Sequence, residues 1–96
     1  MALNRFNTNE VRQIVPLKRG VLESWISGGY LEPSYLEDAA CGKRYMWSRN
    51  DIYELAAFKA LVDSGLKPID AHELLEASVN DEIKNQVDER IKGIFG

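Results

Sequence analysis

The sequence is poor in the residues that build disulfide and metal scaffolds. Its 96 residues include one cysteine, Cys41, and one histidine, His72. A single cysteine cannot form an internal disulfide, and a lone histidine gives none of the ligand spacings that are typical of zinc sites. We therefore expect neither a disulfide framework nor a metal or other cofactor, and we interpret Cys41 as a loop thiol and His72 as a surface side chain.

Long hydrophobic runs are also absent. No apolar stretch approaches the roughly 20 residues that cross a bilayer. The N-terminal sequence MALNRFNTNE has no apolar core of the kind found in secretion signals. We therefore expect a cytoplasmic protein without a membrane segment, and a length of 96 residues fits one domain.

Signatures of catalysis are missing as well. No nucleophile, base and oxyanion donor can be assembled from the sequence pattern, and no glycine-rich phosphate-binding loop occurs. We therefore expect a binding protein and not an enzyme.

Charge is unevenly distributed along the chain. Residues 1–50 carry seven cations and five anions, net +2, whereas residues 51–96 carry five cations and ten anions, net −5. A polyanion such as nucleic acid is met by clustered cations. We expect the first half to contain any nucleic-acid contact and the second half to form an acidic, solvated scaffold.

A short first helix is predicted from about Thr8 to Val15. Just before it, Asn7 and Glu10 have the spacing of a capping box. Pro16 ends the helix, because proline disfavours helical geometry in the preceding residue and has no amide hydrogen to donate.

The stretch from Leu17 to Pro33, LKRGVLESWISGGYLEP, predicts a second short helix around which the rest of the chain is organised. It begins with the cations Lys18 and Arg19 and ends at residues 28–29, a double glycine that can adopt the positive φ of a helix C-cap. The apolar residues that recur at helical spacing and predict a buried face are Val21, Leu22, Trp25 and Ile26. A half-buried helix with a basic start is typical of a recognition helix.

A β-hairpin is predicted between residues 30 and 47. Tyr35 and Leu36 belong to one arm, and residues 43–47, KRYMW, form a basic and aromatic returning arm. Residues 38–42 form the predicted loop between the arms. In a DNA-binding protein such a hairpin is a wing.

Two further helices are predicted after the hairpin. Ser48 and Asp51 have capping-box-like spacing before an apolar helix from Ile52 to Ser64, which should be the most buried helix. Gly65 ends it, and Pro68 suits the first position of the next helix. The expected buried residues of that next helix are Ala71, Leu74 and Leu75.

The last segment, from Asn80, carries a narrow apolar stripe. Its members are Ile83, Val87, Ile91 and Ile94. Such a stripe fits intramolecular packing and fits a dimerisation seam through Ile83, Val87 and Ile91, so both interpretations stay open.

The sequence thus predicts a mainly α-helical domain. Its parts are a helix-turn-helix over residues 6–29, a wing over 30–47, supporting helices over 48–77 and a C-terminal packing or dimerisation helix over 80–96.

Three blocks of the sequence occur in a recognisable order: FNTNEVRQIVPLKRGVLESWISGGYLEP, KRYMWSRNDI and DSGLKPIDAHELLE. Together they resemble the winged helix-turn-helix DNA-binding domain of the MerR family of transcription regulators. The shared pattern is a capped first helix, a turn, a recognition helix that ends before Leu-x-Pro, a wing that closes in an aromatic-Ser helix start, and a later Glu-Leu-Leu. The resemblance covers residues 6–76.

The resemblance implies a sequence-specific protein that binds double-stranded DNA as a two-fold homodimer. The second helix would enter the major groove, and the two-stranded wing would contact the flanking backbone. The residues that would contact DNA are Arg12, Lys18, Arg19, Ser24, Lys43, Arg44, Tyr45 and Arg49.

The sequence also departs from the family. Gly20 and Glu23 stand where family members usually have arginines, although the carboxylate of Glu23 can accept a hydrogen bond from a cytosine amino group. The family's long dimerisation helix and effector-binding domain have no counterpart here, so we expect no ligand sensing of the usual kind.

Two functions remain open. One is a transcription regulator or a small architectural DNA-binding factor, like a phage excisionase or the DNA-recognising subunit of a packaging enzyme. The other is a protein-interaction module, since small chaperone modulators resemble the same fold.

Overall fold

The computed structural model describes the backbone of residues 5–39 and 42–96, and the side chains of all of these except residues 19, 37–39 and 43. Within this part the chain forms five helices and three short strands. In chain order they are β1 (Phe6–Asn7), α1 (Thr8–Ile14), α2 (Arg19–Ser27), β2 (Tyr35–Ala39), β3 (Gly42–Trp47), α3 (Arg49–Asp63), α4 (Pro68–Ser78) and α5 (Asp81–Phe95). The predicted mainly helical fold is confirmed. None of the described helices is long and apolar enough to span a membrane.

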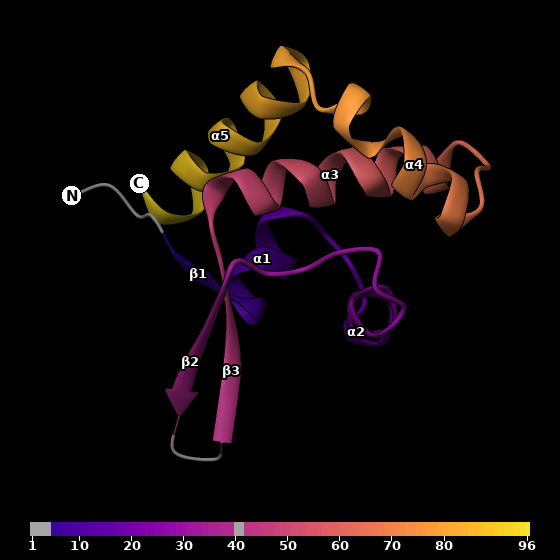
Figure 1. Cartoon of the computed structure of the whole chain (residues 1–96). Coiled ribbons are helices and arrows are strands. Elements are labelled where there is room, and N and C mark those ends of the chain that lie inside the picture. Colours follow the sequence, from indigo (N-terminus) through magenta and orange to yellow (C-terminus); the bar gives the residue numbers. More distant parts are fainter. Residues whose placement is uncertain (1–4, 40–41) are drawn as a thin grey trace.

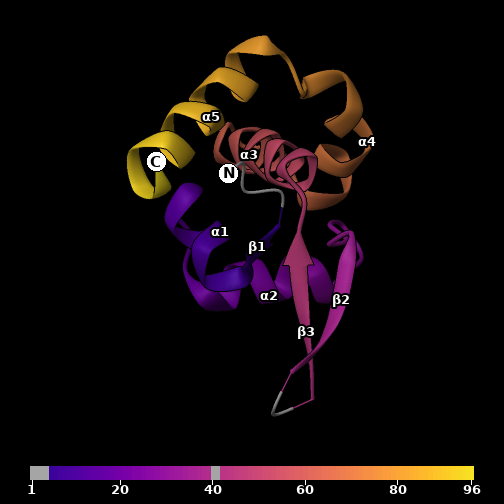
Figure 2. The same cartoon turned by 90° about the vertical axis from the view of Figure 1, so that its left-hand side faces the viewer.

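Helix α3 lies at the centre of the molecule. α4 and α5 lie on one side of it, and α1, α2 and the hairpin formed by β2 and β3 lie on the other side (Figures 1 and 2). Ile52, Leu55 and Phe58 of α3 are fully buried. Trp25 of α2 packs edge-on against Phe58, with 4.8 Å between the ring centroids. Strands β2 and β3 project away from this helical core in both views, on the same side of α3 as α2.

The small sheet has three antiparallel strands in the order β1-β3-β2, where the sequence predicted a two-stranded hairpin. The additional strand is β1, in which Phe6 pairs with Trp47 and Asn7 pairs with Met46. Phe6 and Trp47 are both buried. The extended backbone that enters the cap of α1 lies beside the end of β3, and two residues are too few to show a strand period in the sequence.

The hairpin itself is confirmed, but its strands are longer than predicted. β2 and β3 pair from Tyr35 opposite Met46 to Ala39 opposite Gly42, so pairing extends into the predicted loop of residues 38–42. Gly42 has a φ of 118°, which a residue with a side chain rarely adopts. The predicted loop position of Cys41 lies outside the described residues.

Two residues predicted to be buried, Val21 and Leu74, are exposed, and so is Ile94 of the apolar stripe. Val21 and Leu74 each precede a residue that is buried, Leu22 and Leu75 respectively. Adjacent positions on a helix point about 100° apart, and a helix that packs on one side of a small domain buries only a narrow stripe.

Helix α5 packs back onto its own chain. Val87 and Ile91 are buried against the rest of the domain, where α5 contacts α1 and α3, and Ile83 is half-buried. Arg90 Nε also donates a hydrogen bond to the carbonyl of Ile14 at 2.7 Å. The structure therefore has the intramolecular packing. Of the predicted dimerisation residues, Val87 and Ile91 are thus covered within one chain, and Ile83 is covered in part.

The carboxylate of Asp51 joins the two ends of the hairpin to the start of α3. Asp51 is only 8% exposed. Its Oδ2 accepts hydrogen bonds from the backbone amides of Ser34 at 2.8 Å and Ser48 at 2.9 Å, and its Oδ1 accepts one from the Ser34 hydroxyl at 2.8 Å. Ser48 Oγ in turn accepts from the Asp51 amide, which completes the predicted capping box. One side chain thus caps a helix and fixes the residues that enter β2 and leave β3.

We predict that Asp51→Ala lowers the free energy of unfolding by about 2 kcal/mol, because it removes half of a capping box and three part-buried hydrogen bonds to a charged acceptor. Asp70→Ala is the matched control, since Asp70 is an exposed acid in the first turn of α4, whose N-cap makes no side-chain hydrogen bond. It should cost about 0.5 kcal/mol from the helix dipole alone. Urea unfolding measures both losses. Equal losses in the two variants would contradict the bridging role of Asp51.

Candidate nucleic-acid interface

Helix α2 presents a polar face to solvent. Leu22 and Trp25 fix the opposite face in the core. The exposed face contains small or polar residues at helical spacing, which are Gly20, Glu23, Ser24 and Ser27. No other atom lies within 4 Å of a Cβ built at Gly20, so this face is open at the start of the helix.

The C-terminal end of α2 is set by glycine, as predicted. Gly29 has a φ of 79°. Its amide donates to the carbonyl of Ile26 at 3.0 Å, and the Tyr30 amide donates to that of Trp25 at 3.1 Å, which is the Schellman pattern. The Tyr30 ring then stacks on Phe58, at 5.9 Å between centroids. The helix is therefore held at both its buried face and its end.

A groove of about 520 Å³ lies between the start of α1, α2 and β3. We call it the interface groove, and its lining residues are Thr8, Asn9, Arg12, Glu23, Ile26, Ser27, Arg44 and Tyr45. Arg12 comes from α1 and Arg44 from the hairpin, so two cations far apart in the sequence line the same groove. Hydroxyl and amide side chains on its walls can donate and accept hydrogen bonds.

The structure brings together three of the residues predicted to contact DNA. Arg12, Arg44 and Tyr45 all line the interface groove, and Arg44 and Tyr45 are exposed. Arg12 also donates from Nε to the carbonyl of Leu17 at 3.3 Å, which ties it to the turn that precedes α2.

Of the other predicted contacts at α2 and β3, Lys18 and Ser24 do not line the groove. Lys18 is the exposed N-cap of α2, and Ser24 is exposed one turn further along. Arg19 and Lys43 lie in these elements too, but their side chains are outside the part of the chain that the structure describes.

Arg49, also predicted to contact DNA, does not line the interface groove and is paired within the chain. Its Nη1 forms an ion pair with Asp88 Oδ1 at 2.9 Å, and the Tyr53 hydroxyl donates to the same oxygen at 2.6 Å. The hydrogen bond from Tyr53, together with Arg49, lowers the pKa of Asp88. Burial and the bond to Asp88 raise the pKa of Tyr53. Arg49 therefore fastens α3 to α5, and the family-like position of this residue in the sequence gave no sign of its partner 39 residues away.

The groove is also lined by residues that were not predicted to contact DNA. Thr8 and Asn9 are the first two residues of α1, and Ile26 and Ser27 lie one turn beyond Glu23 on α2. The spacing of Glu23, Ile26 and Ser27, three and four residues apart, is a signal that could have identified the α2 wall. Nothing in the sequence indicates that Thr8 and Asn9 lie opposite, because that depends on how α1 meets β3.

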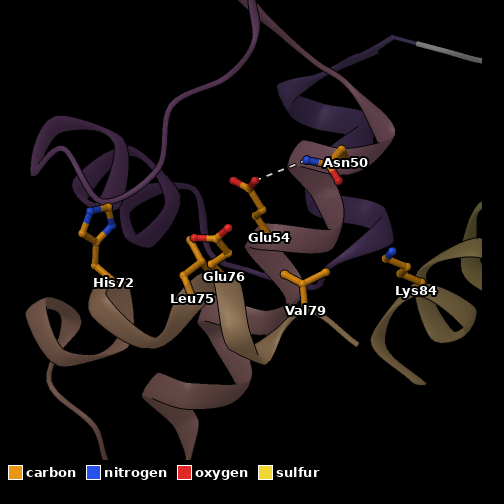
Figure 3. A pocket seen from close by; sticks show the side chains of 7 residues that line it. All are labelled: Asn50, Glu54, His72, Leu75, Glu76, Val79 and Lys84. Atoms are coloured by element: carbon orange, nitrogen blue, oxygen red, sulfur yellow. Dashed lines mark hydrogen bonds between the residues drawn. The ribbon is translucent and has the colours of Figure 1, made fainter. Parts of the chain in front are cut away.

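A second groove, of about 540 Å³, lies between α3, α4 and the start of α5. We call it the α4 groove, and its lining residues are Asn50, Glu54, His72, Leu75, Glu76, Val79 and Lys84 (Figure 3). Glu54 and Glu76 extend into the same space. Burial, followed by the charges of Asp51 and Glu76, raises the pKa of Glu54. His72 is exposed as predicted, and its Nδ1 is 3.0 Å from the carbonyl of Tyr30.

The described residues contain no group of three or more histidine, cysteine, aspartate or glutamate side chains that could hold a metal ion. Comparison with protein-family models, with curated proteins and with solved structures finds no match to this chain.

We predict that Glu54→Gln stabilises the protein at neutral pH. The raised pKa of Glu54 means that its contribution to stability is present below its unfolded pKa, about 4.3, and is lost as the pH rises through the folded value. The amide variant cannot ionise, so its advantage over the original chain should grow from about pH 4 to pH 7 in thermal unfolding. Glu89→Gln, an exposed position on α5, is the control. An advantage of Glu54→Gln that does not change with pH would contradict this assignment.

Proposed function

We propose that the chain is a winged helix-turn-helix protein that binds double-stranded DNA, either as a MerR-like transcription regulator or as a small architectural factor of phage type. The observation that carries the proposal is the interface groove. It combines Arg12 and Arg44, from two separate elements, with a wall formed by α2. The exposed polar face of α2 adjoins it, and the hairpin projects on the same side of the domain.

In the proposed complex, α2 enters the major groove. Its nine residues make a helix about 13 Å long, which is comparable with a major groove about 12 Å wide. The side chains that would face the base edges are Glu23, Ser24 and Ser27, which are exposed on one face. Serine hydroxyls can donate or accept at either kind of base pair, so they position the helix more than they specify a sequence.

The hairpin and the start of α2 would contact phosphates. Arg44 and Tyr45 are exposed on β3, and Lys18 is exposed at the N-cap of α2. Lys18 makes no side-chain cap at the start of α2, where backbone amides of a helix can donate to a phosphate oxygen. Cations that neutralise phosphates release counterions, which supplies affinity that does not depend on sequence.

A two-fold homodimer on DNA is part of this proposal. Two copies of α2 would then read half-sites about 34 Å apart, one turn of the double helix. The contact between copies would have to lie outside Val87 and Ile91, since both are buried within the chain.

One observation favours a protein partner as a second candidate function. Helix α4 exposes Ile69 by 57% and Leu74 by 47%. These apolar residues stand among acids of the same helix, Asp70 and Glu73, and near the α4 groove. In this function α4 would be the recognition surface, and the interface groove would have no ligand.

The test is the salt dependence of binding to a fluorescently labelled duplex of mixed sequence, measured by anisotropy. Arg44→Ala should weaken binding to all sequences and reduce the slope of log affinity against log salt by about 0.9 for one lost phosphate contact. Lys84→Ala is the matched control. It removes one exposed cation from the start of α5, beside the Tyr53 ring and across α3 from the hairpin, and should leave the slope unchanged.

Two results would contradict the proposal. One is the absence of binding by the original chain at about 50 mM salt, where electrostatic binding is strong. The other is an equal change of slope in both variants, which would mean that the contact depends on net charge and not on the interface groove. The first result would favour a protein partner at α4.

A further inference from the structure

We propose that the α4 groove binds a basic segment of a partner protein, with an arginine or lysine head group between Glu54 and Glu76 and aliphatic side chains on the apolar part of the groove. The inference goes beyond DNA binding and does not depend on it, because α4 lies across α3 from α2 and the hairpin (Figures 1 and 2).

The groove combines acidic and apolar side chains. Its wall on α4 is a stripe at helical spacing, formed by His72, Leu75, Glu76 and Val79. Glu54 of α3 extends into the same space as Glu76 (Figure 3). Leu75 is buried and Val79 is half-buried, so the two carboxylates stand beside an apolar surface. A volume of about 540 Å³ lies in the range of protein sites that hold a ligand.

The two carboxylates are not neutralised by the part of the chain that the structure describes. Within that part, Glu76 has no hydrogen-bond or ion-pair partner, and Glu54 accepts one hydrogen bond, from Asn50 Nδ2 at 3.3 Å. Lys84 also lines the groove, but its Nζ lies over the Tyr53 ring, 5.9 Å from the centroid, and away from both carboxylates in Figure 3. The acidic part of the groove is therefore open to a cation from outside.

Keeping Glu54 ionised costs stability in the isolated chain. Burial, followed by the charges of Asp51 and Glu76, raises the pKa of Glu54. A cation between Glu54 and Glu76 would stabilise both ionised carboxylates and offset their repulsion. A carboxylate that opposes folding of the free domain thus acquires a favourable role when a cationic ligand is bound.

Both parts of the groove indicate the chemistry of the ligand. Arginine and lysine side chains combine a charged head with an aliphatic stem, and the guanidinium fork of arginine can donate to more than one carboxylate oxygen. Ile69, three residues before His72 on α4, is 57% exposed and extends the apolar surface beyond the groove. A polypeptide with aliphatic residues beside its cation covers this surface, which a free polyamine does not. DNA does not fit, because its phosphates are anionic.

The experiment is selection of binding peptides from a displayed library of short random sequences on the immobilised chain. The enriched peptides are then synthesised with a fluorescent label, and their affinities are measured by anisotropy. We expect them to carry an arginine or lysine close to aliphatic residues. The double variant Glu54→Gln/Glu76→Gln should bind them about tenfold more weakly or worse, because it removes the charge of both acceptors.

The matched control is Glu73→Gln/Glu89→Gln. It removes the same net charge from two exposed positions that do not line the groove, and it should change the affinities by about twofold or less. Circular dichroism of both double variants should match that of the original chain, since Glu54 and Glu76 make no contact on which the fold depends.

Four results would overturn the inference. They are enriched peptides without basic residues or no enrichment at all, equal weakening in the two double variants, competition by spermidine at the same concentration as the peptide, and self-association of the original chain that Glu54→Gln/Glu76→Gln abolishes. The last would mean that a second copy occupies the groove. A duplex added at low salt should leave the peptide affinity unchanged, and a chain that binds peptide but no duplex would contradict the proposed function alone.

Discussion

The hydrogen bonds of Asp51 connect both ends of the hairpin to the start of α3. A buried carboxylate that accepts from Ser34 and Ser48 places the entry to β2, the exit from β3 and the start of α3 at one point. Charge-assisted bonds to amides are stronger than neutral ones, and burial makes their loss costly. Because α3 also carries the packing of α2 through Phe58 and Trp25, the same helix fixes the hairpin and α2 relative to each other. The interface groove depends on that relation.

The two sides of α3 differ in charge, and the difference fits the proposed division of roles. Helices α4 and α5 are rich in exposed acids, such as Glu73, Glu76 and Glu89, which would be repelled by DNA. They lie across α3 from α2 and the hairpin. A domain that approached DNA by the groove between α1, α2 and β3 would keep its acidic helices turned away. The net charge of −3 is thus no guide to what one face can bind.

The sequence predicted best the features that are encoded locally. The capping boxes at Asn7 and Ser48, and the first helical position of Pro68, depend on residues within one helical turn, and all three are confirmed. Features that depend on contacts between distant segments could not be predicted. Arg49 looked like a surface cation because its partner on α5 is 39 residues away, and β1 exists only because the end of β3 lies beside it.

The residues of the candidate site also differ in how far the sequence predicts them. Arg44 and Tyr45 follow from the composition of the hairpin, whereas the opposing wall of Thr8 and Asn9 follows from tertiary packing alone.

In the proposed function, DNA binds the surface formed by α1, α2 and β3. The most direct measurement is a nuclear magnetic resonance titration of the isotope-labelled chain with a short duplex at low salt. Binding at this surface should change the amide shifts at the start of α1, along the exposed face of α2 and in β3, while those of α4 and α5 stay in place. Changes confined to α4, or none on the three proposed elements, would contradict it.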